Sequence, residues 1–337
     1  MDAYQTKQMF CGAAVAAFLI LPSLSPGHAA PTAPQAMLVS DSGGWVTSPQ
    51  KSFAVRSVKV DDLVGTVAVS VKPDGPVMLD ISGLKSRVDG LDVAAEGGSL
   101  RVEGRRVNSV WDWRNWFDFS GDNKPDPKNL MVKLTVPKGT ELSIHGLVGD
   151  AVIGDTMGPL NFEAAVSNAK IGRVGAAKLS LAGSGRIEAV EIDGPLKLEI
   201  AGAGKVHVGK SKAVKADIAG AGDAQLGHID GGLRLSIAGS GDVAAASVNG
   251  PVHVSIAGSG SVKIANGEAN PLHVSIMGSG NIDFGGMAVD PDISALGSGS
   301  VRLKAYRGHL SGNARGIVKV NGQSVKGSGG DDDDDSD

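Results

Sequence analysis

Residues 235–241 read LSIAGSG, and versions of this phrase recur through the second half of the chain. The six others are LSLAGSG, LEIAGAG, ADIAGAG, VSIAGSG, VSIMGSG and ISALGSG. In chain order, the first glycines of the seven phrases are Gly183, Gly202, Gly220, Gly239, Gly258, Gly278 and Gly297. They are separated by 19, 18, 19, 19, 20 and 19 residues. A near-constant period of this length is the signature of a repeat architecture.

The residues around each of these glycines predict two strands. Before Gly239, the apolar Leu235 and Ile237 are separated by the polar Ser236, and the other phrases alternate in nearly the same way. Period-two alternation is typical of a strand with one buried face, and an apolar residue four positions after the glycine, such as Val243, marks a second strand. Glycine suits the corner between the strands because it adopts positive φ without steric cost.

A single unit of this length is too small to bury its own apolar face. Stacked units would pair their strands with the coils above and below, ~4.8 Å apart, and would align equivalent residues into ladders. The sequence therefore predicts an all-β fold, a single-stranded parallel β-helix or β-solenoid, whose coils follow the 19-residue spacing of the glycines.

The N-terminus has the pattern of an export signal. Lys7 precedes an apolar run from Met9 to Leu21, and small residues that include Gly27 and Ala29 follow this run. The run is short for a membrane span, and the small residues favour cleavage after Ala29. We therefore expect the mature chain to be exported and to contain no transmembrane segment. Periplasm, cell surface and external medium are all compatible with such a signal.

The remaining signals divide the chain into parts. We expect a signal peptide over 1–29, a linker over 30–50, the solenoid over 51–322 with an aromatic insertion at 108–129, and a flexible acidic tail over 323–337. The formal net charge is −4, and six aspartates lie within 331–337, so residues 1–330 carry +2. This nearly neutral body lacks the basic excess of nucleic-acid-binding proteins, and no nucleic-acid partner is expected.

Three of the four tryptophans lie in one short segment inside the expected insertion. Its candidate binding residues are Trp111, Trp113, Arg114, Trp116, Phe117 and Phe119. Aromatic rings beside polar groups suit the stacking of sugars or the anchoring of a protein partner. The alternative interpretation is a structural cap, in which the aromatic side chains fold over the open edge of a coil.

A second candidate site is a row of basic or titratable residues, each five positions before a repeat glycine. Its members are Lys178, Lys197, Lys215, Arg234, His253 and His273, and we call this row the basic ladder. Stacking would align them on one outer face, where they could attract an anionic polymer. The alternative is an ordinary solvated face, since Glu199 and Asp217 lie on the same strands and offset part of the charge. The two histidines would add charge below about pH 6.5 and strengthen such binding in acid.

No metal site, cofactor or catalytic residue is predicted. The Gly-x-Gly-Asp segments at 220–223 and 239–242 lack the nine-residue period of calcium-binding β-rolls. The chain has no HExxH motif and no phosphate-binding loop, and no Ser-His-Asp spacing is recognisable.

The apparent export signal, the phrase VPKGTELSI at 136–144 and the GSG-x-V coils resemble the head GIN domain of putative autotransporter adhesins, over roughly residues 53–310. This resemblance implies a right-handed parallel β-helix-like fold in the bacterial envelope, and it brings no catalytic motif with it.

Together these patterns predict an exported, non-enzymatic, adhesin-like binding or scaffold solenoid. It would present a long face and an aromatic loop to an envelope glycan or protein. One alternative is a polysaccharide-active β-helix enzyme, a lyase or hydrolase, whose catalytic residues come from distant coils. Another is a purely structural protein that self-associates through its open strand edges. The oligomeric state is not predicted.

Overall fold

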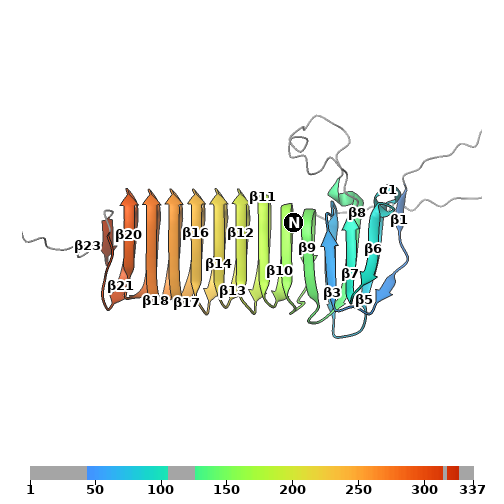
Figure 1. Ribbon diagram of the computed structural model, residues 1–337, viewed down its shortest axis with the longest axis horizontal. Coiled ribbons are helices and arrows are strands. Elements are labelled where there is room, and N and C mark those ends of the chain that lie inside the picture. Colours follow the sequence, from blue (N-terminus) through green and yellow to red (C-terminus); the bar gives the residue numbers. More distant parts are fainter. Residues whose placement is uncertain (1–43, 105–125, 314–316, 326–337) are drawn as a thin grey trace, which may run out of the picture. The chain divides into compact units, whose positions relative to one another are not determined.

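The computed structural model describes residues 44–104, 126–313 and 317–325, which belong to one compact unit, Gly43–Asp337. Strands dominate these residues, and the only helical segments among them are α1 (Lys85–Val88) and the short 3-10 helix η1 (Pro127–Asn129). The strands join into one hydrogen-bonded network that forms a parallel β-solenoid (Figure 1). The predicted all-β solenoid is therefore confirmed. The expected signal peptide lies outside the described residues.

Each regular coil contributes to two walls, which we call wall A and wall B. Wall A contains the residues that precede the repeat glycine, and wall B contains the residues that follow it. The strands confined to wall A are β12 (Leu196–Gly202), β14 (Val214–Gly220), β16 (Leu233–Gly239) and β20 (Asp292–Gly297). Those confined to wall B are β13 (Lys205–Ser211), β15 (Asp223–Ile229), β19 (Asn281–Val289) and β21 (Ser300–Arg307).

Five longer strands continue from one wall into the other. They are β9 (Glu141–Ile153), β10 (Leu160–Val174), β11 (Ala177–Ile192), β17 (Asp242–Gly258) and β18 (Ser261–Gly278). From β9 onward, neighbouring coils pair in parallel. The repeat glycines lie in register, as in the pairs Gly220–Gly239 and Gly239–Gly258, so the coil period equals the sequence period.

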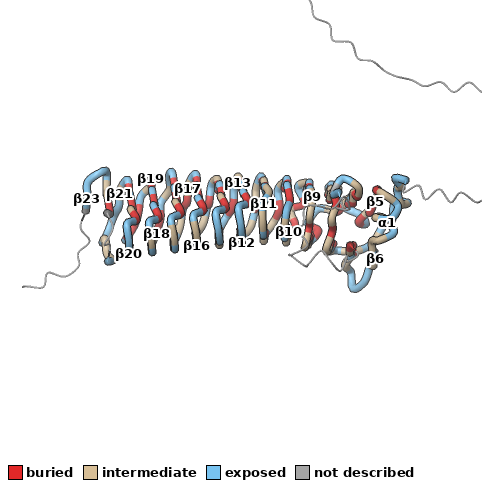
Figure 2. The backbone as a smooth tube through the Cα atoms, turned by 90° about the horizontal axis from the view of Figure 1, so that it is seen from above, coloured by how far each residue is buried: buried red, intermediate tan, exposed pale blue. Residues whose placement is uncertain are grey.

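The core is the narrow space between the two walls, where Figure 2 shows the buried residues. Wall A contributes a row of isoleucines and wall B a row of smaller aliphatic residues. The two rows are Ile200, Ile218, Ile237, Ile256 and Ile276, and Val206, Ala224, Val243, Val262 and Ile282, each at most 2% exposed. The alternation that predicted each strand thus becomes a continuous ladder of like side chains along the stack.

The N-terminal coils are stacked in an order that differs from their order in the sequence. The strands β3 (Ser57–Asp61) and β4 (Thr66–Lys72) form the first coil, and β7 (Ser99–Gly104) and β8 (Leu130–Pro137) contribute to the next. β3 lies between β7 and β9, and β4 lies between β8 and β9. The coil with β7 and β8 therefore stacks on one face of the first coil, toward the N-terminal end of the stack. The coil that contains β9 stacks on the opposite face of the first coil. Within the expected solenoid over 51–322, the spatial order of the coils therefore departs from their order in the sequence in this region.

Antiparallel strands close the N-terminal end of the stack. β5 (Val77–Leu84) pairs with β8, and β6 (Leu91–Glu96) pairs with β7. The short strands β1 (Trp45–Thr47) and β2 (Lys51–Phe53) in turn pair with β5. An unpaired edge strand exposes backbone donors and acceptors, and these strands satisfy the edge of the parallel stack. Within the expected linker 30–50, residues 45–47 are thus part of the folded cap.

A hairpin closes wall B at the other end. β22 (Ile317–Val320) pairs in parallel with β21, and β23 (Gln323–Val325) pairs in antiparallel fashion with β22. Asn321 and Gly322 form the turn with φ of 48° and 81°, the positive values that a two-residue hairpin turn requires. The expected flexible tail therefore begins with a strand. Its aspartates lie outside the described residues.

No helix in the described part of the chain is long and apolar enough to cross a membrane.

Candidate functional site

The basic ladder is a physical row on the outer surface of wall A. Its six members are consecutive Cα partners in neighbouring strands, from Lys178 in β11 to His273 in β18. Each lies between two inward residues of its strand, so its side chain points away from the core. Parallel pairing in register therefore places one ladder residue in every coil, ~4.8 Å from the next.

The row continues beyond the six residues that the sequence indicated. Asn161 pairs with Lys178 and Ser143, and Lys59 pairs with Ser143 and Arg101. Lys59 and Arg101 thus extend the row toward the cap. Neither could be found by counting back from a repeat glycine, because the N-terminal coils have no such glycine and are stacked out of order. At the opposite end, Asp292 follows His273.

Carboxylates on the same wall neutralise part of the ladder. Glu199 lies 3.4 Å from the Nζ of Lys178 and 2.6 Å from that of Lys197, and Asp217 lies 3.8 Å from that of Lys215. The hydrogen bond from Lys197 lowers the pKa of Glu199 and is the main cause of that shift. These three lysines therefore have two carboxylates between them. Within the described ranges, Arg234 has no carboxylate at ion-pair distance.

The rings of the two histidines of the ladder lie next to each other at an interplanar angle of 34°. The ring centroids of His253 and His273 are 4.8 Å apart, and His273 Nδ1 lies 3.5 Å from a carboxylate oxygen of Asp292. Burial lowers the pKa of His253, and the neighbouring His273 and Arg234 lower it further. His253 therefore becomes charged only at a pH below the ordinary pKa of a histidine. The strengthening of anion binding that was expected below about pH 6.5 should begin, for this residue, in more acidic solution.

Protonation of His253 should make stability depend on pH. Because the pKa of His253 is lower in the folded than in the unfolded chain, the unfolded chain takes up this proton first as pH falls. The contribution of neutral His253 is then complete above about pH 6.5 and is lost toward lower pH. Urea unfolding of the wild type and His253→Gln tests this between about pH 7.5 and about pH 5.5. The stability of the wild type relative to the variant should fall as the pH is lowered. A difference that stays constant or grows as the pH is lowered would contradict this prediction.

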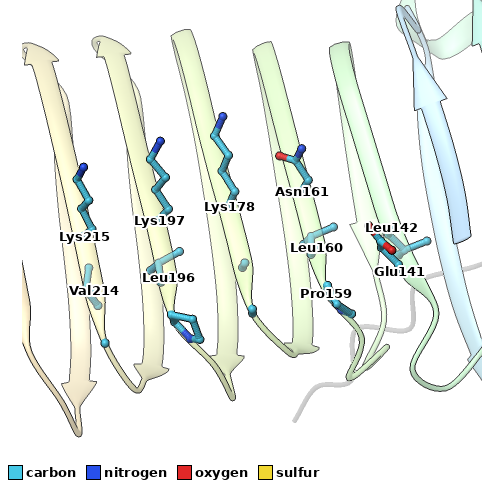
Figure 3. A pocket seen from close by; sticks show the side chains of 14 residues that line it. Glu141, Leu142, Pro159, Leu160, Asn161, Lys178, Leu196, Lys197, Val214 and Lys215 are labelled. Carbon is cyan, nitrogen blue, oxygen red and sulfur yellow. The ribbon is translucent and has the colours of Figure 1, made fainter.

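A shallow groove of about 520 Å³ runs beside the ladder, along the corner where the strands of wall A begin (Figure 3). It crosses the coils that contain β9, β10, β11, β12 and β14. Its corner and inward lining residues are Glu141, Leu142, Pro159, Leu160, Ala176, Ala177, Pro195, Leu196, Ala213 and Val214. Asn161, Lys178, Lys197 and Lys215 complete the lining.

Each coil supplies the same positions to this groove. One is the corner residue, the next is the first inward residue of wall A, and in most of these coils the third is the ladder residue. The corner residues Pro159, Ala176, Pro195 and Ala213 are short or cyclic, so they leave space above the backbone. The result is an apolar surface bordered by three lysines whose side chains project from neighbouring strands in one direction (Figure 3).

The aromatic segment lies outside the described residues, so the structure assigns no position to Trp111, Trp113, Arg114, Trp116, Phe117 or Phe119. Its binding role stays a prediction. The fourth tryptophan, Trp45, lies on β1 and is 54% exposed. Within the described ranges, no group of three or more His, Cys, Asp or Glu side chains could hold a metal ion.

The architecture defines a parallel β-solenoid with an antiparallel cap, and a family match accompanies it. Residues 229–324, from the end of β15 into β23, match the model of the family described as putative auto-transporter adhesin, head GIN domain. The resemblance inferred from the sequence is confirmed over this segment, which includes Arg234, His253 and His273 but not the groove.

Several solved structures are similar to the chain. A putative lipid binding protein from Parabacteroides distasonis ATCC 8503 is 18% identical, with a TM-score of 0.45 over 83% of this chain and 97% of that one. A putative adhesin from the same strain is 14% identical, with a TM-score of 0.36 over 83% and 98%. A putative adhesin from Bacteroides fragilis NCTC 9343 is 14% identical, with a TM-score of 0.32 over 82% and 97%. No curated protein matches the chain.

Proposed function

We propose that this chain is an exported, non-enzymatic protein of the bacterial envelope that binds an anionic polymer along wall A. The observation that carries the proposal is the alignment of the six ladder residues, one per coil, on a single outer face. The family description and the N-terminal sequence pattern support an exported adhesin-like protein. The aromatic segment is included as a second contact site for the same envelope partner, on the strength of its sequence.

Competition with the protein's own carboxylates favours a polymer over a single small anion. The ion pairs of Lys178, Lys197 and Lys215 are formed by side chains that are 39%, 46% and 53% exposed. Exposed pairs of this kind are screened by solvent and contribute little to stability. A ligand with several linked charges can displace or bridge them together, because its second and later contacts are effectively intramolecular.

Removal of the three lysines tests the proposal. The variant Lys178→Gln, Lys197→Gln, Lys215→Gln is expected to bind dextran sulfate about tenfold more weakly than the wild type, since three exposed ionic contacts are lost. It should also show a shallower dependence of affinity on salt. Titration of the mature chain with dextran sulfate at several salt concentrations measures both effects.

Wall B offers a matched control. Lys205, Lys210 and Lys263 lie on its outer side, and two of them form ion pairs of 3.3 Å with Asp223 and Asp230. The variant Lys205→Gln, Lys210→Gln, Lys263→Gln removes the same charge and should bind almost as tightly as the wild type. An equal loss in both variants would show non-specific attraction and overturn the proposal. So would a wild-type protein that does not bind the polymer.

The non-enzymatic part of the proposal is tested separately. Polygalacturonate incubated with the mature chain is expected to keep its length and to gain no new reducing ends. Turnover that persists after repurification and is lost on substitution of a carboxylate of the chain would establish the β-helix enzyme instead.

A further inference from the structure

We infer that the groove along wall A binds a linear acidic polysaccharide, a 1,4-linked polyuronate, whose chain runs parallel to the solenoid axis with one sugar per coil. The inference rests on the proposed function, and it names the class of the ligand and the place where it lies. Its basis is the combination of an apolar floor, a row of three lysines and a repeat distance set by the coils.

The distance between equivalent positions along the groove favours some extended polymers over others as ligands. Equivalent groove atoms recur at every coil, ~4.8 Å apart. A 1,4-linked pyranose chain advances by nearly this distance per sugar, so one sugar can lie on each coil, while successive carboxylates point to different sides of the chain. An extended peptide presents side chains on one side only every second residue, ~6.8 Å apart, and loses register with the coils. Lysine also has a long, rotatable stem, which lets its ammonium group follow carboxylates on either side of a sugar chain.

The backbone of the groove floor disfavours a peptide for a second reason. The amides of Leu160, Ala177 and Leu196 already donate to the carbonyls of the next coil, over 2.9, 3.0 and 2.8 Å. A peptide strand could not be added there, since strand addition needs free backbone groups. What the groove offers is an apolar surface and charged side-chain ends.

These two features match the apolar ring face and the carboxylate of a uronate. The ring of a sugar has apolar C–H faces, which can lie on Pro159, Pro195 and the alanines of the corner. Its carboxylate can then reach Lys178, Lys197 or Lys215, whose positions are shown in Figure 3. A neutral glycan would leave the lysines unused.

The length of the groove sets the length of the ligand. The groove extends from the coil of Leu142 to that of Val214, a span of four coil intervals, or ~19 Å. About five sugars would therefore occupy it. Its first coil contributes Glu141 and its second Asn161, so the lysines of the lining lie over the coils from Lys178 to Lys215, where Glu199 and Asp217 offset part of their charge.

Titration of the mature chain with oligogalacturonates of increasing length tests the inference. Affinity should rise with each added sugar up to about five and then level off, because further sugars extend beyond the groove. The methyl-esterified oligomers should bind about tenfold more weakly, since the ionic contacts are absent. Poly-L-glutamate should bind more weakly than polygalacturonate of equal charge. Equal or tighter binding of poly-L-glutamate would overturn the inference in favour of an acidic peptide.

Groove-filling variants separate this inference from the proposed function. Ala176→Phe and Ala213→Phe introduce a large side chain at exposed corner positions and leave every lysine in place. Each should weaken binding of the pentamer by about tenfold, as contact with the floor is lost. Ala244→Phe, at an exposed alanine on wall B, is the matched control and should have no effect.

The outcomes are distinguishable. If the wild type binds dextran sulfate through the lysines but the filled variants bind the pentamer as well as the wild type does, the groove is not the site and the proposed function stands. The same holds if affinity does not depend on oligomer length. If the wild type binds neither polymer, both the inference and the proposed function fail.

Discussion

Valine in place of Gly239 is expected to lower the free energy of unfolding by about 4 kcal/mol or more, because it combines backbone strain with a steric clash in a packed stack. Gly239 has a φ of 132°, a conformation that residues with a Cβ rarely adopt. A Cβ at this position would also lie closer than 3.0 Å to the carbonyl oxygen of Gly220 in the preceding coil. That oxygen accepts the hydrogen bond from the amide of Ser240, so relief of the clash would separate the coils at their corner.

The neighbouring residue provides the control. Ala238 is exposed on the outer side of β16, where valine is a favourable strand residue. Ala238→Val introduces the same side chain one position earlier and should change stability by no more than about 0.5 kcal/mol. Denaturant unfolding followed by circular dichroism compares the two variants with the wild type. Similar stability for Gly239→Val and Ala238→Val would show that the close approach of the corner is not required.

The regular coils could be predicted from sequence because their pairing follows the repeat itself. In a stack of near-equal coils paired in parallel, a sequence alignment on the glycine is also the spatial register. Lys178 and His273 lie 95 positions apart in the chain and still belong to one row, as the alignment indicated. The period of the repeat alone therefore identifies which residues share a ladder.

The order of the N-terminal coils could not be predicted in this way. Residues 57–60 and 99–102 alternate alike, and alternation identifies a strand without specifying its partner. The insertion of β3 between β7 and β9 depends on long-range packing. The turns at the ends do have a local sequence signal, which the expected boundary of the tail at residue 323 did not take into account. Gly97-Gly98 joins β6 to β7 and Asn321-Gly322 joins β22 to β23, and both pairs are hairpin signals.

The groove also could not be predicted from the pattern that revealed the ladder. It depends on the size of the corner residue that precedes each wall A strand, such as Ala176 or Ala213. Such small or cyclic residues are common in turns, so their sequence carries no sign of a cavity. Only the stacking of several such corners side by side produces a continuous hollow.

Alanine in place of Phe284 is expected to unfold the C-terminal coils selectively. Phe284 is fully buried on wall B between Ile264 and Leu303, its partners in the coils on either side. Removal of a buried phenylalanine costs about 3 to 5 kcal/mol. Each coil of a solenoid contacts mainly its neighbours, so the loss acts on the coils near the substitution. Taken together, the coils that follow β18 adjoin the rest of the stack on one side only, so they should open before the rest.

Hydrogen exchange measured by mass spectrometry distinguishes local from global opening. In Phe284→Ala, amides of β19 and β21 should lose protection while those of β12 and β14 retain it. Phe284→Leu, which keeps most of the volume, should cost less than about 1.5 kcal/mol and change the pattern little. Phe162→Ala removes an equally buried ring from β10, which lies between β9 and β11 and is far from the C-terminal end of the stack. This variant should also weaken protection across the adjoining coils toward the cap. Uniform loss of protection in Phe284→Ala would instead mean that the cap and all coils unfold as a single cooperative unit.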